Sequence, residues 1–202
     1  MKSRTKIAAA LLGALAAGSV SAAADPVYSP KGTVNSANYT FEAVATGDVY
    51  AYFMSQSADY SEVVGMATAN STTAIHGTGL NNHTSTRGQK IDLGHVTAGE
   101  IVTFFIKVTN TGLTFSSQVN ENADDTQHIY SKAYAGSVSP IFIPKGIFVS
   151  FEDLANKVSD HDYNDSAYVF TNVRAVPEPA NVALMLAGLG LLGAAARRRR
   201  AD

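Results

Sequence analysis

Residues 100–110 read EIVTFFIKVTN, and this stretch decides the fold class. Every second position from 102 to 108 is apolar, which is the period of a β-strand with one face in the core. Ile101 and Phe105 add apolar side chains to the other face. We therefore expect the strand to be covered on both faces for part of its length, like the middle strand of a sandwich.

The sequence on either side has the same texture, with short alternating runs separated by Gly, Asn, Asp, Ser and Thr. This texture predicts an all-β fold, an antiparallel β-sandwich of about seven to nine strands, jelly-roll-like or Ig-like. Gly47-Asp48 is interpreted as a hairpin turn, and residues 69–88 as an exposed loop or a frayed edge hairpin. The other predicted strands are 39–45, 48–55, 89–96, 127–134, 147–151 and 166–174.

The N-terminal residues 1–24 have the three parts of a secretory signal peptide. Three basic residues lie within the first six positions, an apolar run covers 7–17, and small residues end the segment at 21–24. The apolar run is too short to cross a bilayer comfortably. We therefore expect export through the Sec translocon, cleavage by signal peptidase, and a β-sandwich domain over residues 25–175.

The C-terminal residues 176–202 carry a second signal. A Val-Pro-Glu-Pro sequence is followed by an apolar stretch over 180–196 and then by four arginines. Seventeen residues is near the lower limit for a membrane-spanning helix, and the arginines would hold that end in the cytoplasm. The domain would then lie outside the membrane.

The order of these three parts resembles the PEP-CTERM tail of Gram-negative bacteria. The resemblance implies recognition and removal by an exosortase, transient insertion in the inner membrane, and a final place at the cell surface or outside the cell. Proteins with such tails are often exopolysaccharide or biofilm components. An ordinary single-pass anchor is the alternative. The residues that match the tail are Pro177, Glu178, Pro179, Arg197, Arg198, Arg199 and Arg200.

Composition excludes several functions. The chain has no cysteine, so it can form neither disulfides nor thiolate metal sites. Charged residues make up 16% and the formal net charge is −2, so no general field attracts nucleic acid. The sequence has no G-x-S-x-G elbow, H-E-x-x-H pair or P-loop. We therefore expect a protein that is not an enzyme.

The most distinctive sequence of the domain is an acidic segment, FEDL at 151–154 followed by SDHDYND at 159–165. Five carboxylates lie within fourteen residues of a chain that is otherwise poor in charge. Asp160, Asp162 and Asn164 stand two residues apart, a spacing that lets a tight loop direct oxygens at one calcium ion. Asp165 and Glu152 are candidates to complete the shell.

Two other interpretations of this segment stay open. The carboxylates could accept backbone hydrogen bonds in a purely structural turn. Alternatively, Glu152 and Asp162 could act as the acid pair of a polysaccharide hydrolase. A second polar patch at 120–125 is interpreted as a solvated loop, with a further ion site as the alternative.

The acidic segment and the final strand after it resemble the signature of the DUF4114 family. Upstream, Asp92-Leu93-Gly94 and Ala98-Gly99-Glu100 are similar to what precedes the signature in such proteins, so the likeness covers about 90–174. The resemblance implies an exported protein and a β-sandwich, and it implies no activity.

The leading hypothesis is a non-catalytic protein of the cell surface or extracellular matrix, with a calcium-stabilised acidic loop. The alternative is a carbohydrate-binding module for exopolysaccharide, in which Tyr50, Tyr52 and Tyr60 would stack on sugar rings.

Overall fold

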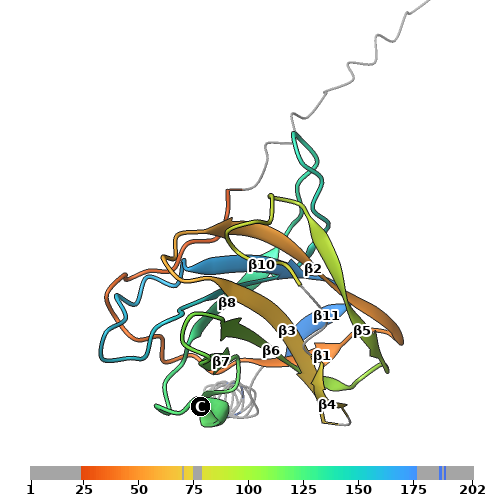
Figure 1. Ribbon diagram of the computed structural model, residues 1–202. Helices are drawn as coiled ribbons and strands as arrows, with labels where there is room; N and C mark the ends of the chain where they lie inside the picture. Colours follow the sequence, from red (N-terminus) through yellow and green to blue (C-terminus); the bar gives the residue numbers. More distant parts are fainter. Residues whose placement is uncertain (1–23, 70, 75–78, 177–186, 188, 190–202) are drawn as a thin grey trace, which may run out of the picture.

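The computed structural model describes residues 24–69, 71–74, 79–176, 187 and 189, and within them it has eleven strands in two antiparallel sheets (Figure 1). The first sheet has the order β11 (Val173–Val176), β1 (Thr40–Ala43), β6 (Ile101–Val108), β3 (Glu62–Thr68) and β4 (Ser71–Ala74), with β7 (Thr114–Ser116) also paired to β6. The second has the order β5 (Lys90–Val96), β2 (Gly47–Gln56), β10 (Ser166–Phe170), β9 (Gly146–Phe151) and β8 (Ile129–Tyr134). A 3-10 turn covers Val119–Glu121. The all-β, two-sheet prediction is confirmed, although the strands outnumber the expected seven to nine.

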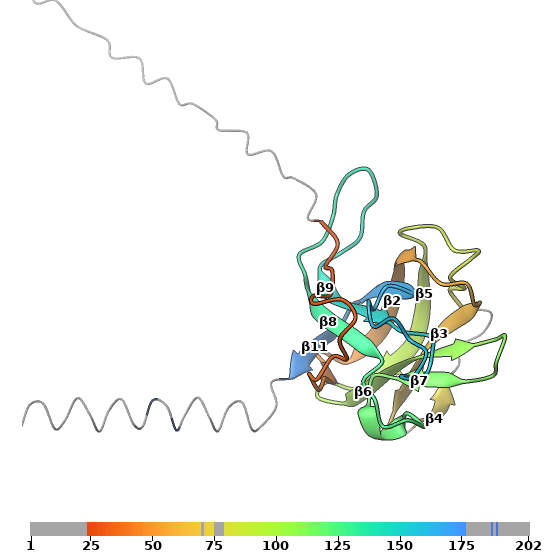
Figure 2. The same cartoon turned by 90° about the vertical axis from the view of Figure 1, so that its left-hand side faces the viewer.

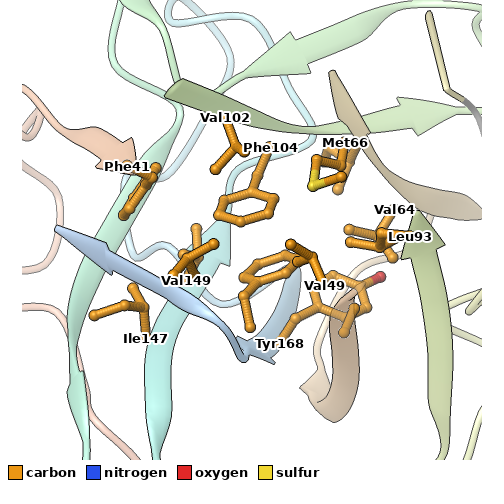
Figure 3. Close-up of a cluster of buried hydrophobic side chains, with 14 of the residues drawn as sticks. Phe41, Val49, Val64, Met66, Leu93, Val102, Phe104, Ile147, Val149 and Tyr168 are labelled. Atoms are coloured by element: carbon orange, nitrogen blue, oxygen red, sulfur yellow. The ribbon is translucent and has the colours of Figure 1, made fainter. Parts of the chain in front are cut away.

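The main core lies between the two sheets, where side chains from both layers point toward one another (Figure 3). Strand β6 supplies its central row, because the alternating residues from Val102 to Val108 are fully buried. The Phe104 ring stacks on Phe170 of the opposite sheet with 3.7 Å between ring centroids. The sequence prediction for this strand is therefore confirmed for its inner face.

The outer face of β6 is covered only in part. Phe105 is buried, whereas Ile101 is 43% exposed. The Phe105 ring lies over Gly65 of β3, where an added Cβ would stand 2.3 Å from the ring. Glycine at this position therefore provides the space that the aromatic ring occupies.

A second apolar cluster lies on the outer face of the second sheet. It contains Met54, Phe148 and Val169, and Ile143 from the β8–β9 loop packs into it. This loop projects from the body of the domain (Figures 1 and 2). Pro140 and Pro144 flank residues 141–143, whose only pairing among the described residues is an isolated bridge between Ile143 and Ser137.

The predicted hairpin at Gly47-Asp48 is wrong. Strand β1 pairs with β11 and β6, whereas β2 pairs with β10 and β5, so the two strands belong to different sheets. The predicted strand 166–174 is likewise divided between the sheets. Asn172 breaks it with φ +61°, and its side chain bonds both the N–H and the C=O of Ala45 at 3.0 and 2.9 Å. The Asn172 side chain thus links the β10–β11 connection to the β1–β2 connection, and at each of these connections the chain passes from one sheet to the other.

Strand β3 was missed by the sequence pattern because Gly65 interrupts its run of apolar residues. The strand nevertheless pairs with β6 along its whole length. Within the predicted loop 69–88, residues Ser71–Ala74 form a short edge strand.

The two predicted targeting segments lie outside the described residues, apart from Ala24 of the signal peptide and residues 176, 187 and 189 of the tail. Over the part of the chain that is described, no helix is long and apolar enough to cross a membrane.

Candidate functional site

The acidic segment forms the connection between β9 and β10 at one end of the sandwich. It lies beside the N-terminal part of the domain (Figure 2), where the backbone N–H of Gly32 donates to the C=O of His161 at 3.1 Å. The two neighbouring strands fix its ends, because Asp165 N–H donates to Phe151 C=O at 3.1 Å. The segment is therefore a closed loop held on both sides.

Three of the five predicted calcium ligands come together. One ligand oxygen each from Glu152, Asp160 and Asp162 lies within 4.8 Å of the others. We call these three residues the outer carboxylate group. Glu152 is 2% exposed, Asp162 is half-buried and Asp160 is exposed. A cation at this point would be closed in on one side and open to solvent on the other.

Hydrogen bonds within the loop hold Glu152 in place. One of its oxygens accepts from the backbone N–H of Tyr163 and the other from the hydroxyl of Ser159. The same hydroxyl accepts from the backbone N–H of His161 at 3.0 Å. His161 and Tyr163 adopt left-handed φ values of 53° and 52°, a conformation that is uncommon for residues other than glycine. The loop is thus folded tightly around the carboxylate.

Tyr163 anchors the loop to the domain. Its ring is buried and meets Tyr28 edge-on at 4.5 Å. Its hydroxyl donates to Gln127 C=O at 3.0 Å and accepts from Asn35 N–H at 2.8 Å. Burial raises the pKa of this hydroxyl to about 12, so it stays a donor at physiological pH. Tyr163 therefore ties the position of the loop to the core of the domain.

Asp162 has one occupied oxygen and one free oxygen. Its Oδ2 accepts from the Lys31 ammonium at 3.0 Å and from the Asn164 side-chain amide. Its Oδ1 is closed off from solvent and has no hydrogen-bond partner among the described residues. Asn164 therefore lies next to the outer carboxylate group. Lys31 is a cation that the sequence did not place here.

Asp165 is turned away from the outer carboxylate group. Its Oδ2 accepts from the backbone N–H of Asp153 at 2.8 Å, and the residue lines a neighbouring pocket of about 440 Å³. Burial and nearby Asp153, Glu152 and Asp160 raise its pKa to about 8. The structure thus divides the predicted ligand set between two adjacent places. Whether a metal binds there stays a prediction.

Sequence reasoning missed two acidic residues from another part of the chain. Asp59 lines the pocket, and Glu62 is fully buried behind it. Neither oxygen of Glu62 has a hydrogen bond of ordinary geometry within the described residues. Burial raises the pKa of Glu62 to about 8, the Ser166 hydroxyl offsets part of this, and Asp153 and Asp165 add to it. The sequence signal for Glu62 is a charged residue at a position of β3 that faces inward.

The second polar patch is a structural turn. The Asn122 side chain bonds Ser116 N–H, Ser116 C=O and Thr126 C=O at 2.6 to 3.0 Å. Asp124 accepts from the Asn156 N–H at 2.9 Å and contacts the buried His128 ring at 3.1 Å. The side chains of Asn122 and Asp124 are therefore occupied in holding this turn together.

Fold and site together define a two-sheet antiparallel sandwich with an acidic pocket at one end. Residues 175–200 match the family model of the PEP-CTERM protein-sorting motif, and this range contains all seven predicted motif residues. The match supports an exported protein that transits the membrane and is sorted by an exosortase. Neither the curated proteins nor the solved structures gave a significant match. The DUF4114 resemblance over 90–174 stays a prediction.

Proposed function

We propose that this protein is a non-catalytic component of the Gram-negative cell surface or extracellular matrix, with a calcium-stabilised acidic loop. The exosortase motif supports delivery to that place. The observation that carries the calcium part is the outer carboxylate group, in which Glu152, Asp160 and Asp162 converge within 4.8 Å. Exopolysaccharide is the partner that the sorting class suggests.

Bringing three carboxylates this close together destabilises the fold unless a cation balances their charge. Like charges a few Å apart repel one another, and burial of Glu152 and Asp162 weakens the screening by water. Lys31 offsets part of the charge from one side. Calcium takes six to eight oxygen ligands in flexible geometry, so carboxylates, the Asn164 amide oxygen and waters suit it. The exported domain would meet this ion at high concentration.

Calcium should raise the melting temperature of the protein. Extracellular sites bind with dissociation constants of about 10⁻⁴ to 10⁻³ M, so ~1 mM calcium adds about 0.4 to 1.4 kcal/mol of stability. For a domain of this size that is a shift of roughly 1 to 5 °C in a thermal melt. Asp162→Asn should reduce the shift, while Asp92→Asn on the exposed part of β5 should not. Identical melts of the wild-type protein in calcium and in chelator would refute the calcium proposal.

A carbohydrate-binding role is the second candidate, and Tyr60 is the observation that favours it. Its side chain lines the acidic pocket and is partly exposed, so it could stack on a sugar held there. Tyr50 instead lies under the Lys90 ammonium at 4.7 Å, and Tyr52 packs against the second apolar cluster. A glycan array distinguishes the candidates: retention of a polysaccharide that is lost in Tyr60→Ala would favour binding over a purely structural role.

A further inference from the structure

The pocket next to the outer carboxylate group is acidic on both of its walls. One wall comes from the β2–β3 connection, which leads from the second sheet to the first, and the other from the β9–β10 connection. Five carboxylates face this space, and no lysine, arginine or histidine is among the lining residues that the structure describes. The lining residues are Ser57, Asp59, Tyr60, Glu152, Asp153, Leu154, Val158, Asp160 and Asp165.

Asp153 supplies a second, independent feature. Its side chain lines the pocket although the residue is only 4% exposed. Its Oδ2 is closed off from solvent and has no hydrogen-bond partner within the described part of the chain. A buried carboxylate oxygen without a partner loses its hydration and gains nothing in return. The geometry therefore leaves a position in the pocket for a group that this oxygen can bind.

The charge around Asp153 points to a cation as that group. Burial raises the pKa of Asp153 to about 6, with the Asp165 carboxyl partly offsetting it, and repulsion from Glu152, Asp59 and Asp160 adds to the increase. Lys31 cannot relieve this repulsion directly, because its ammonium is bonded to Asp162 in the outer group. Fully buried Glu62 adds a further carboxyl behind the pocket.

We propose that this pocket binds a divalent cation of its own, with calcium as the fitting class, in addition to the ion at the outer carboxylate group. Asp153 and Asp165 would bind it from one wall and Asp59 from the other, and Glu152 and Asp160 would lie between the two ions. All of these ligands are carboxylate oxygens, which hard cations prefer. The pocket site shares Glu152 and Asp160 with the calcium site of the proposed function, and only in this respect does it rest on that function.

Such an ion would connect the two sheets at this end of the sandwich. Asp59 lies shortly before β3 of the first sheet, whereas Asp153 and Asp165 flank β9 and β10 of the second. Binding would therefore tie together segments about one hundred residues apart in the sequence. A tie of this kind stabilises the folded state alone, since the unfolded chain does not hold these ligands together.

Calcium stoichiometry tests the proposal. Full-length protein in a mild detergent is titrated with calcium chloride by calorimetry, with equilibrium dialysis as a second measure. We expect two ions per wild-type chain, one in Asp153→Asn and one in Asp162→Asn. Asp59→Asn changes an exposed residue and removes one of the proposed ligands, so it should weaken one of the two sites by at least the roughly tenfold that loss of an outer-shell partner costs. Asp92→Asn is the control and should retain both ions.

The outcomes separate this proposal from the calcium site of the outer group. One ion per chain, retained in Asp153→Asn and lost in Asp162→Asn, would overturn the pocket site and leave the outer site standing. One ion lost in Asp153→Asn but retained in Asp162→Asn would support the pocket and overturn the outer site. No bound calcium at all would overturn both. Circular dichroism in chelator confirms that each variant is folded.

Discussion

Calcium-free protein should lose several kcal/mol of stability between pH 5 and pH 8, and Glu62→Gln should remove a large part of that loss. Glu62 is fully buried, and its pKa rises from 4.5 to about 8 in the folded state. Below about pH 4.5 the carboxyl is protonated in both states and costs nothing. As the pH rises toward 8, the unfolded chain releases the proton and the folded chain must keep it or bury a charge, so stability falls.

The size of this effect follows from the difference in pKa. Each pH unit between the two values corresponds to about 1.4 kcal/mol, which gives on the order of 5 kcal/mol for Glu62. Urea denaturation in chelator at a series of pH values measures it. Glu42→Gln in β1 is the matched control, because Glu42 forms a surface ion pair with Arg174 and should change stability by less than about 1 kcal/mol. Equal pH profiles for wild type and Glu62→Gln would show that Glu62 is not protonated in the fold.

Phe104→Ala should destabilise the protein by about 3 to 5 kcal/mol, the usual cost of removing a fully buried phenylalanine. Its ring is 0% exposed and stacks on Phe170 across the two sheets. The deletion would leave a cavity in the centre of the sandwich, because neighbouring strands on both sides fix the backbone. Chemical denaturation of wild type and variant gives the difference directly.

Phe142→Ala makes the same chemical change at an exposed position. Phe142 is 65% exposed in the projecting β8–β9 loop, so the variant should lose less than about 1 kcal/mol. Equal losses for the two variants would contradict the assignment of the core to the space between the sheets.

The fold class could be predicted from β6 because its pattern is local. The period of two within a single strand identifies its inner face without knowledge of its neighbours. Whether β1 and β2 form a hairpin depends on which sheet each strand joins, and they join different sheets. At the turn between them, Ala45 is bonded by Asn172, which lies more than one hundred residues away in the sequence. Topology of this kind leaves no signal in the sequence near the turn.

The part of the candidate site that lies within one loop could likewise be predicted, because its spacing is a local pattern, whereas the part that depends on distant residues could not. The two-residue spacing of Asp160 and Asp162 in one tight loop brings both toward Glu152. Asp165 departs from the prediction because its backbone already pairs with Phe151 next to β10, so the sheet sets the direction of its side chain. Asp59 reaches the site only through the three-dimensional fold.

The intact mass of the protein recovered from the extracellular or outer-membrane fraction tests the central claim most directly. If the chain is exported and sorted by an exosortase, its mass should correspond to a species that begins near Ala23 or Asp25 and ends near Pro179, without the segment 180–202. The match at 175–200 places the motif across that cleavage region. A mature species that still carries Arg197 to Arg200 would contradict removal of the tail and would show a plain membrane anchor instead.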